Sequence, residues 1–276
     1  MKLQKIYFCI NISGGDVTLF ATGKVFQLIM LIFLTSVFLY YINRTKSGWV
    51  PTIKTIAGLE AIEEAVGRAT EMGRPIHYTP GIAPINGALA AQTFAGLEVL
   101  AVTARLVARY GARIIVTLRQ PTVLPLAEEV VSNAYIAEGT SESYDPDSVR
   151  YLSQAQFAYA AGVMGTMVRE RVAANIMLGG FWAESLIMAE AASEIGAIQI
   201  AGTARLTQIP FFVVACDYVL IGEELFAASA IASQNPIKLG SIAGQDIGKV
   251  VAVALILVGA LLESAGVGFL SQLVSK

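Results

Sequence analysis

The sequence predicts an α/β protein anchored in a membrane: a Rossmann-like layered domain with a mostly parallel sheet, flanked by an N-terminal and a C-terminal transmembrane helix. Composition is the first observation behind this prediction. Only 14% of the residues are charged and the mean hydropathy is +0.63, whereas soluble domains have about 25% charged residues. The second observation is an uncharged apolar run at 25–42. The third is a regular alternation of strand-like and helix-like segments between residues 57 and 235, which is typical of a parallel sheet covered by helices.

Composition also excludes several kinds of site. The formal net charge is −2 and the basic residues are not clustered, so a nucleic-acid-binding surface is not predicted. Cys9 and Cys216 are the two cysteines and no CxxC motif occurs, which excludes a disulfide framework and a cysteine-based zinc site. His77 is the single histidine, so a metal site built from several histidines is excluded as well.

The N-terminal part of the chain reads as an extension at 1–23, a transmembrane helix at 24–43 and a juxtamembrane linker at 44–56. The apolar run is about 18 residues long, near the ~20 that cross the hydrocarbon core of a bilayer. Tyr40 and Tyr41 end it, as interfacial aromatic residues do, and Arg44 and Lys46 follow. A signal peptide is the alternative, but the run is long for one and no small-residue cleavage site stands out. A retained anchor is therefore the favoured interpretation.

Strands and helices alternate through the predicted α/β domain at 57–235. Its first helix, at 58–75, has an apolar face and ends at Gly73 and Pro75. Strands are expected at 76–79, 113–118, 173–178, 197–201 and 209–215, and helices at 88–109, 123–138, 154–169 and 181–194. The last two strands are short apolar runs suited to burial on both faces. The polar segment 140–149 is expected to be a surface loop, and a helix leads from the last strand back toward the membrane.

A second linker is predicted at 236–246 and a second transmembrane helix at 247–273. The apolar core of this helix is short, and Glu263 interrupts it, facing either a neighbouring subunit or the far interface. If both helices span, the two termini share one side of the membrane. The flanking basic residues are slightly biased toward the domain side, which predicts a cell-membrane protein with a cytoplasmic α/β domain.

Glycines follow several of the predicted strands, and this is where parallel sheets bind ligands. Gly179, Gly180, Gly202 and Thr203 are the residues predicted to hold an anionic or nucleotide-like ligand, because glycine admits a ligand to the backbone and a helix N-terminus favours an anion. Neither GxGxxG nor GxxxxGK[ST] is present. Tight turns between strand and helix are therefore the favoured interpretation of these glycines.

Three carboxylates, Asp217, Glu223 and Glu224, lie in an otherwise apolar stretch and need partners. They could bind a hard divalent cation through oxygen ligands, and a helical segment would place Asp217 and Glu224 on one face. No other cofactor is predicted. The favoured alternative is structural ion pairing, for which the chain offers charged residues in apolar surroundings: Arg68, Arg74, Arg169, Glu184 and Glu190. His77 is expected to be a core residue rather than a catalytic base.

Longer motifs carry a resemblance. The chain between residues 56 and 249 resembles a family of prokaryotic membrane-anchored proteins catalogued only as domain of unknown function 6754. Four segments show the resemblance: GLEAIEEAVGRATEMGRP, FAYAAGVMGTMVRERVAAN, QIPFFVVACDYVLIGEELFAASA and GQDIGK. The resemblance implies one membrane helix on each side of a single α/β domain. It implies no activity.

Two functions remain open from the sequence. The first is a non-enzymatic membrane protein, a homo-oligomeric scaffold or assembly component, whose partners are the lipid bilayer and further copies of the chain; small-residue helices and paired membrane segments favour it. The alternative is an α/β domain that binds a metal or an anionic ligand and could be enzymatic. No motif names a reaction, so the sequence does not predict an enzyme.

Overall fold

The computed structural model describes residues 25–51 and 55–266, and the chain divides into two compact units. One unit is the α/β domain, within residues 52–235. The other, which we call the hairpin unit, combines the N-terminal part of the chain up to residue 51 with the part from residue 236 onward. The extension predicted at 1–23 lies outside the described residues, as does the end of the C-terminal helix predicted to reach residue 273.

The α/β domain is built on one sheet, and in the described part of the chain this sheet has six strands, all parallel. The strands are β1 (Ile76–Gly81), β2 (Ile114–Leu118), β3 (Val149–Tyr151), β4 (Ala174–Gly180), β5 (Ile198–Thr203) and β6 (Tyr218–Ile221). Their order is β3-β2-β1-β4-β5-β6, so the chain reverses its direction of winding between β1 and β4. The predicted α/β fold class is confirmed.

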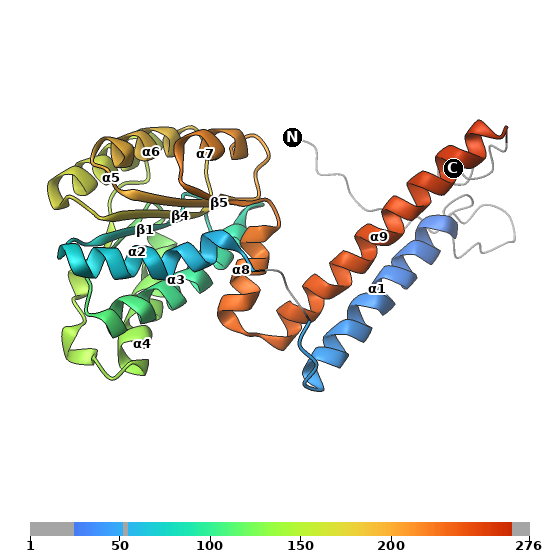
Figure 1. Cartoon of the computed structure of the whole chain (residues 1–276), viewed down its shortest axis with the longest axis horizontal. Coiled ribbons are helices and arrows are strands. Elements are labelled where there is room, and N and C mark those ends of the chain that lie inside the picture. The colour runs from blue at the N-terminus through green and yellow to red at the C-terminus, as the bar shows by residue number, and fades with distance from the viewer. Residues whose placement is uncertain (1–24, 52–54, 267–276) are drawn as a thin grey trace, which may run out of the picture. The chain divides into compact units, whose positions relative to one another are not determined.

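Helices cover both faces of the sheet (Figure 1). One face carries α2 (Ala57–Met72), α3 (Ala90–Tyr110), α4 (Leu124–Ala137) and α8 (Glu224–Ser233), and the other carries α5 (Gln156–Glu170), α6 (Glu184–Glu194) and α7 (Ile209–Ala215). Short 3-10 turns occupy Pro121–Val123, Ser141–Ser143 and Pro146–Ser148. Helices α2 and α3 end at Gly73 and Gly111, both in the left-handed conformation that glycine adopts most easily.

Each face of the sheet has its own hydrophobic core. Under α2 and α3 the core includes Ile62, Val66 and Leu100, all with at most 1% of their surface exposed. Under α5, α6 and α7 it includes Phe181 and Phe212, whose rings meet edge to face with centroids 5.6 Å apart. Strands covered on both faces are mostly apolar, which is why β1, β2 and β4 were recognisable in the sequence.

The segment 209–215 was predicted to be a strand, and this prediction is wrong: it forms α7. Strands β5 and β6 are parallel neighbours, so the chain between them has to return along the sheet before β6 begins. Pro210 stands in the first turn of the returning helix, where its fixed φ angle suits an α-helix. The sixth strand is instead Tyr218–Ile221, and the predicted surface loop ends in the short edge strand β3.

The hairpin unit consists of α1 (Val25–Lys46) and α9 (Pro236–Ser264) packed antiparallel. Residues 236–246, predicted as a linker, are helical and form the first turns of α9. Gly240, Gly244 and Gly248, four residues apart, face α1. A Cβ added to Gly240 would lie 2.7 Å from Ile42 Cα, one on Gly244 3.0 Å from Phe38 Cδ1, and one on Gly248 3.5 Å from Leu34 Cδ2. Glycines at this spacing let two helix backbones approach closely, as in membrane helix pairs.

Three helices in the described residues are long and apolar enough to cross a membrane: α1, α9 and α3. They differ in burial, because the apolar windows of α1 and α9 are not buried at all, whereas 56% of the α3 window is buried. Helix α3 supplies Val99, Leu100 and Ala104 to the core of the α/β domain. This leaves α1 and α9 as the candidate spans with apolar side chains facing outward.

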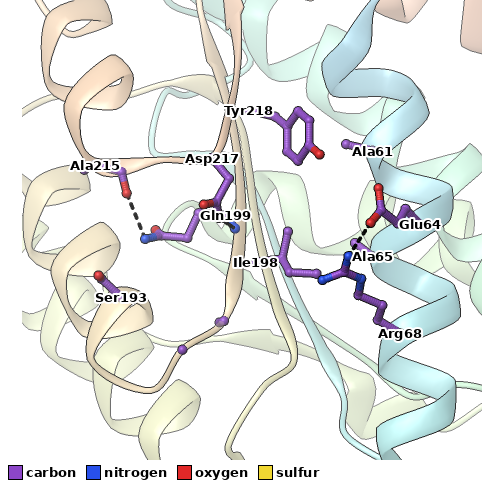
Figure 2. Close-up of a pocket in the computed structure, with 12 residues that line it drawn as sticks. Ala61, Glu64, Ala65, Arg68, Ser193, Ile198, Gln199, Ala215, Asp217 and Tyr218 are labelled. Carbon is purple, nitrogen blue, oxygen red and sulfur yellow. Dashed lines mark hydrogen bonds and ion pairs between the residues drawn. The ribbon is translucent and has the colours of Figure 1, made fainter.

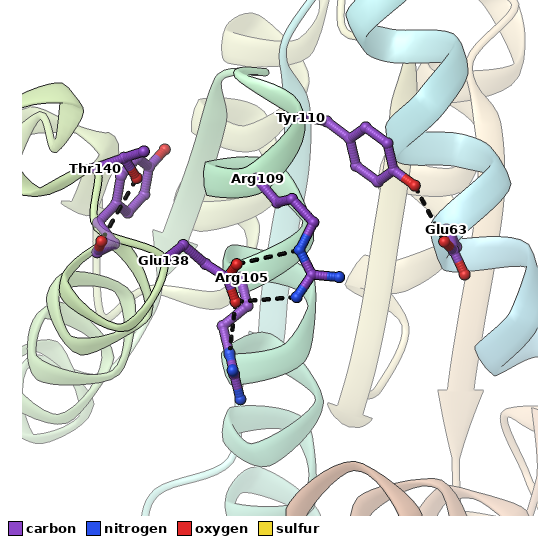
Figure 3. Close-up of polar contacts among 7 residues, drawn as sticks. Glu63, Arg105, Arg109, Tyr110, Glu138 and Thr140 are labelled. Atoms are coloured by element: carbon purple, nitrogen blue, oxygen red, sulfur yellow. Dashed lines mark hydrogen bonds and ion pairs between the residues drawn. The ribbon is translucent and has the colours of Figure 1, made fainter.

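Polar contacts join the helices on the α3 side of the domain (Figure 3). Glu138 accepts hydrogen bonds from Arg105 Nε and Arg109 Nε, both at 3.1 Å, and Tyr110 Oη donates to Glu63 at 3.1 Å. The hydrogen bonds from Arg109 and then Arg105 lower the pKa of Glu138. These pairs connect α3 with the C-terminal end of α4 and with α2, and none of the residues predicted for ion pairing takes part in them.

Candidate functional site

The carboxyl ends of β1 and β4 meet at the point where the winding reverses, which is where doubly wound sheets bind ligands. Here the backbones of the two strands contact each other directly: Gly81 pairs with Gly180, and the Ile82 N–H donates to the Gly180 carbonyl at 2.9 Å. A Cβ on Gly179 would overlap the carbonyl oxygen of Pro80. These glycines therefore allow strand backbones to pack together, and the ligand-binding role predicted for Gly179 and Gly180 stays a prediction.

The other predicted ligand residues, Gly202 and Thr203, end β5 and are also in contact with protein. The Thr203 hydroxyl donates to Gln92 Oε1 at 3.1 Å, and the Ala204 N–H donates to the same oxygen at 2.9 Å. A Cβ on Gly202 would lie 2.8 Å from Leu178 Cδ2 and 2.9 Å from Leu220 Cβ. Thr203 is fully buried, so its contacts fasten the end of β5 to α3.

Glu184 is the most deeply buried carboxylate of the described domain, with none of its surface exposed. It begins α6, and its oxygens accept hydrogen bonds from the Trp182 N–H at 2.8 Å and from Gln156 Nε2. The N-terminus of a helix also favours a negative charge. The structural role predicted for Glu184 thus rests on hydrogen bonds and the helix end rather than on an arginine.

A polar network runs beneath α5 through the centre of the sheet. His77 lies between Asn175 and Thr117, with its Nδ1 2.7 Å from Asn175 Oδ1 and its Nε2 2.7 Å from Thr117 Oγ1. The hydroxyl of Tyr159 continues the network, 3.1 Å from Thr117 Oγ1 and 2.8 Å from that of Thr79. All five residues are completely buried. The prediction that His77 is a core residue is confirmed.

Burial is the main cause of the pKa shift of His77 in this network. It lowers the pKa of His77 from 6.5 to about 4, against a smaller opposing effect of the hydrogen bond with Asn175. Burial likewise raises the pKa of Tyr159 to about 12. Both side chains are therefore neutral at pH 7 and act as hydrogen-bonding partners inside the core.

The predicted cation ligands are not brought together. Asp217 precedes β6 and accepts a hydrogen bond from the Gln199 N–H at 2.8 Å, whereas Glu223 and Glu224 follow the other end of the strand. Glu224 accepts from the Ile221 N–H at 2.8 Å. Asp217 and Glu224 do not share a helical face, because a strand separates them. Across residues 25–51 and 55–266, no group of three His, Cys, Asp or Glu side chains is placed to hold a metal ion.

The residues predicted for ion pairing have different surroundings. Arg68 pairs with Glu64 at 2.6 Å, one turn away on α2, and both side chains are about half exposed. Within the described part of the chain, Arg74, Arg169 and Glu190 make no ion pair. Exposed pairs of this type contribute little to stability, about 0–1 kcal/mol.

A pocket lies at the opposite edge of the sheet, at the amino ends of β5 and β6 (Figure 2). Its volume is about 580 Å³, within the ~300–1,000 Å³ typical of small-molecule sites. Helix α2 forms one wall with Ala61, Ala65 and the Glu64–Arg68 pair, and Gln199 and Asp217 lie across from it. Sequence reasoning missed this site because its walls come from segments about 130 residues apart.

A second feature that sequence reasoning missed is a set of exposed apolar side chains on α7 and in the turn before it, which we call the α7 patch: Leu206, Phe211, Val213 and Val214. Val214 is 89% exposed and Leu206 80% exposed. The run 209–215 was assigned to a buried strand, so its exposure was not foreseen. Large apolar side chains gathered on a surface mark contacts with another molecule.

Comparisons with known proteins identify a family but no function. The family model described as Domain of unknown function (DUF6754) matches residues 15–274, nearly the whole chain. No curated protein and no solved structure matches significantly.

Proposed function

The chain belongs to the family described as Domain of unknown function (DUF6754), and we propose that it is an integral membrane protein whose α/β domain assembles into a homo-oligomeric scaffold. Helices α1 and α9 cross the cell membrane as a hairpin, and the α/β domain lies on the cytoplasmic side. No enzymatic activity is part of this proposal.

The hairpin supports membrane insertion through its outward-facing side chains. Leu31 and Leu39 on α1 and Ile256 and Leu261 on α9 are 62–71% exposed, and burying such side chains in lipid is favourable. At the C-terminal end of α1, the Arg44 guanidinium lies 4.5 Å from the ring centre of Trp49, and Tyr41 lies beside the same ring. Aromatic and basic residues gather in this way at the membrane–water interface.

The α7 patch is the main observation that supports assembly into a homo-oligomeric scaffold. Its four side chains are apolar and lie on a domain whose polar groups at the carboxyl edge are already hydrogen-bonded to protein. A second copy of the chain, presenting the same patch, buries these side chains without requiring any charged partner. Symmetric pairing of one surface with itself is the commonest form of self-association.

Replacing Val214 with aspartate should therefore dissociate the assembly. We expect the dissociation constant for self-association to rise by about thirtyfold or more, because a charge replaces a contact at the centre of the interface. The measurement is native mass spectrometry of the full chain in detergent at micromolar concentration.

Ile136→Asp is the matched control, since Ile136 is also an exposed apolar helix residue (60%) but lies on α4. It should leave the assembly unchanged. A monomeric wild-type protein, or an assembly that Val214→Asp leaves intact, would contradict the scaffold.

Ligand binding is a second candidate function, and the pocket at the amino ends of β5 and β6 favours it. The Arg68 guanidinium offers hydrogen-bond donors and the Glu64 and Asp217 carboxylates offer acceptors, which suits a polar small molecule that carries groups of both kinds. A thermal-shift screen of the full chain with nucleotides, inorganic phosphate and divalent ions tests it. A stabilising compound should lose its effect in the Arg68→Gln variant; no shift from any compound, or an equal shift in both proteins, would exclude binding at this pocket.

A further inference from the structure

Helix α5 is apolar on both of its sides. Its inner side packs on the sheet, with Val163 and Met167 completely buried. Its outer side carries four exposed apolar residues, which we call the α5 face: Phe157, Ala161, Met164 and Val168. Phe157 is 61% exposed, and no charged residue occurs between it and Val168. A helix that is apolar all round is normally covered on all sides, which indicates that another surface covers the α5 face.

Helix α2, on the opposite side of the sheet, shows that this surface is particular to α5. The exposed side of α2 is mostly charged: Glu60, Glu63, Glu64, Arg68 and Glu71. The residues of the α5 face are separated by four, three and four positions, so they lie in one line along the helix. Lines of apolar residues at this spacing form the seam between two packed helices. The α5 face therefore suits a helix as its partner.

Charges of opposite sign border the α5 face. Arg169 follows it at the end of α5, and helix α6 packs beside α5 (Figure 1). On the outer side of α6, Leu186 is 45% exposed near the start of the helix, and Glu190 and Glu194 are exposed toward its end. Among the described residues, Arg169, Glu190 and Glu194 form no ion pair. Both helices are thus apolar toward their starts and charged at their ends, with opposite signs.

This arrangement makes the surface complementary to a second copy of itself. Helices α5 and α6 lead into the neighbouring parallel strands β4 and β5, so both run in the same direction. A two-fold axis along the helices, between α5 and α6, would place α5 of one copy on α6 of the other. Phe157 then meets Leu186 at one end of the contact and Arg169 meets Glu190 at the other. In a symmetric pair each contact occurs twice.

A lipid surface matches the α5 face less well than a second copy does. Glu190 and Glu194 lie on the neighbouring helix of the same layer, and charged side chains are costly in lipid. In the pair of copies the same carboxylates face the guanidinium group of Arg169, with which they can form hydrogen-bonded ion pairs.

We propose that the α5 face and the outer side of α6 form a second self-association interface, in which Arg169 of one copy pairs with Glu190 of another. This inference rests on the proposed scaffold and deepens it. The α7 patch joins copies in pairs, and the α5 face joins those pairs to one another. The assembly therefore contains more than two copies.

A charge swap within the chain tests the proposal, with native mass spectrometry of the full chain in detergent as the readout. Arg169→Glu and Glu190→Arg each place like charges opposite one another, so each should raise the dissociation constant of this interface roughly tenfold and shift the assembly toward pairs. The double variant Arg169→Glu, Glu190→Arg restores opposite charges across the interface and should recover the wild-type distribution. Both side chains are exposed, so neither change disturbs the core.

Met164→Asp tests the apolar part of the interface and should also shift the assembly toward pairs. Its matched control is Met72→Asp, because Met72 is an exposed methionine (51%) on α2, and this change should leave the distribution as in wild type.

Four results would overturn one proposal or the other. A monomeric wild type overturns the scaffold itself. A wild type that forms pairs only, which neither the charge variants nor Met164→Asp change, leaves the scaffold on the α7 patch and removes the α5 interface. Charge variants that weaken the assembly without recovery in the double variant show that Arg169 and Glu190 do not meet, and the proposal fails. If Met164→Asp alone leaves larger assemblies intact, something other than a second copy covers the α5 face, and the proposal fails as well.

Discussion

Lowering the pH from 7 to 4 should remove about 3 kcal/mol from the unfolding free energy through His77 alone. Burial lowers the pKa of this histidine from 6.5 to about 4, so the folded protein keeps it neutral where the unfolded chain protonates it. The unfolded state binds the extra proton, and stability therefore rises with pH across this window. The contribution is fully present above pH 6.5 and is lost as the pH falls toward 4. A difference of about 2.5 pKa units corresponds to roughly 3 kcal/mol.

Urea unfolding of the full chain in detergent, followed by the fluorescence of Trp182, measures this change. A Trp49→Phe background makes Trp182 the single reporter, because the chain has two tryptophans. The control is His77→Gln, which keeps a hydrogen-bonding side chain but does not titrate. Since His77 is the only histidine, this variant should lose the histidine part of the pH dependence and retain the part due to carboxylates. Equal slopes in both proteins between pH 6.5 and 4 would show that His77 is not buried as a neutral base.

His77 also shows which features of the core could be predicted from the sequence and which could not. Its burial was predictable, because it lies in a strand-like apolar segment between two helices. Its partners Asn175 and Thr117 were not, since they are 98 and 40 residues away and only the strand order brings them beside it. Local patterns identify elements; the contacts between side chains depend on how those elements are arranged.

The error at 209–215 has a similar origin. The run is short, apolar and rich in β-branched and aromatic residues, and these properties do not separate a buried strand from a short exposed helix. The parallel pairing of β5 and β6 requires a returning segment between them, so residues 209–215 form a helix and not a strand. This pairing is a property of the whole sheet. This error concealed the α7 patch, which is the main evidence for the proposed scaffold.

In the hairpin unit, the sequence contains a helix-packing pattern that the prediction did not use. Gly240, Gly244 and Gly248 are spaced four residues apart, which is the pattern of closely packed membrane helices. The assignment of 236–246 to a linker placed two of these glycines outside any helix.

Replacing Gly179 with alanine should destabilise the α/β domain by about 4 kcal/mol. Two effects combine. Gly179 has a φ of 153°, which side-chain-bearing residues rarely adopt and which costs roughly 1–3 kcal/mol. In addition, the new methyl group would overlap the Pro80 carbonyl, and overpacking of this kind costs about 1–3 kcal/mol. The obstacle is backbone in a central strand, so a change of rotamer does not relieve it.

The matched control is Gly165→Ala, in the interior of α5, where an added Cβ meets nothing within 4 Å. It should raise stability by about 0.5–1 kcal/mol, because alanine favours a helix more than glycine does. Urea unfolding reported by Trp182 measures both variants. The comparison also separates the two roles considered for Gly179. A packing role requires the large loss of stability, whereas a Gly179→Ala protein as stable as wild type would show that the strand ends can separate and would favour a ligand between them.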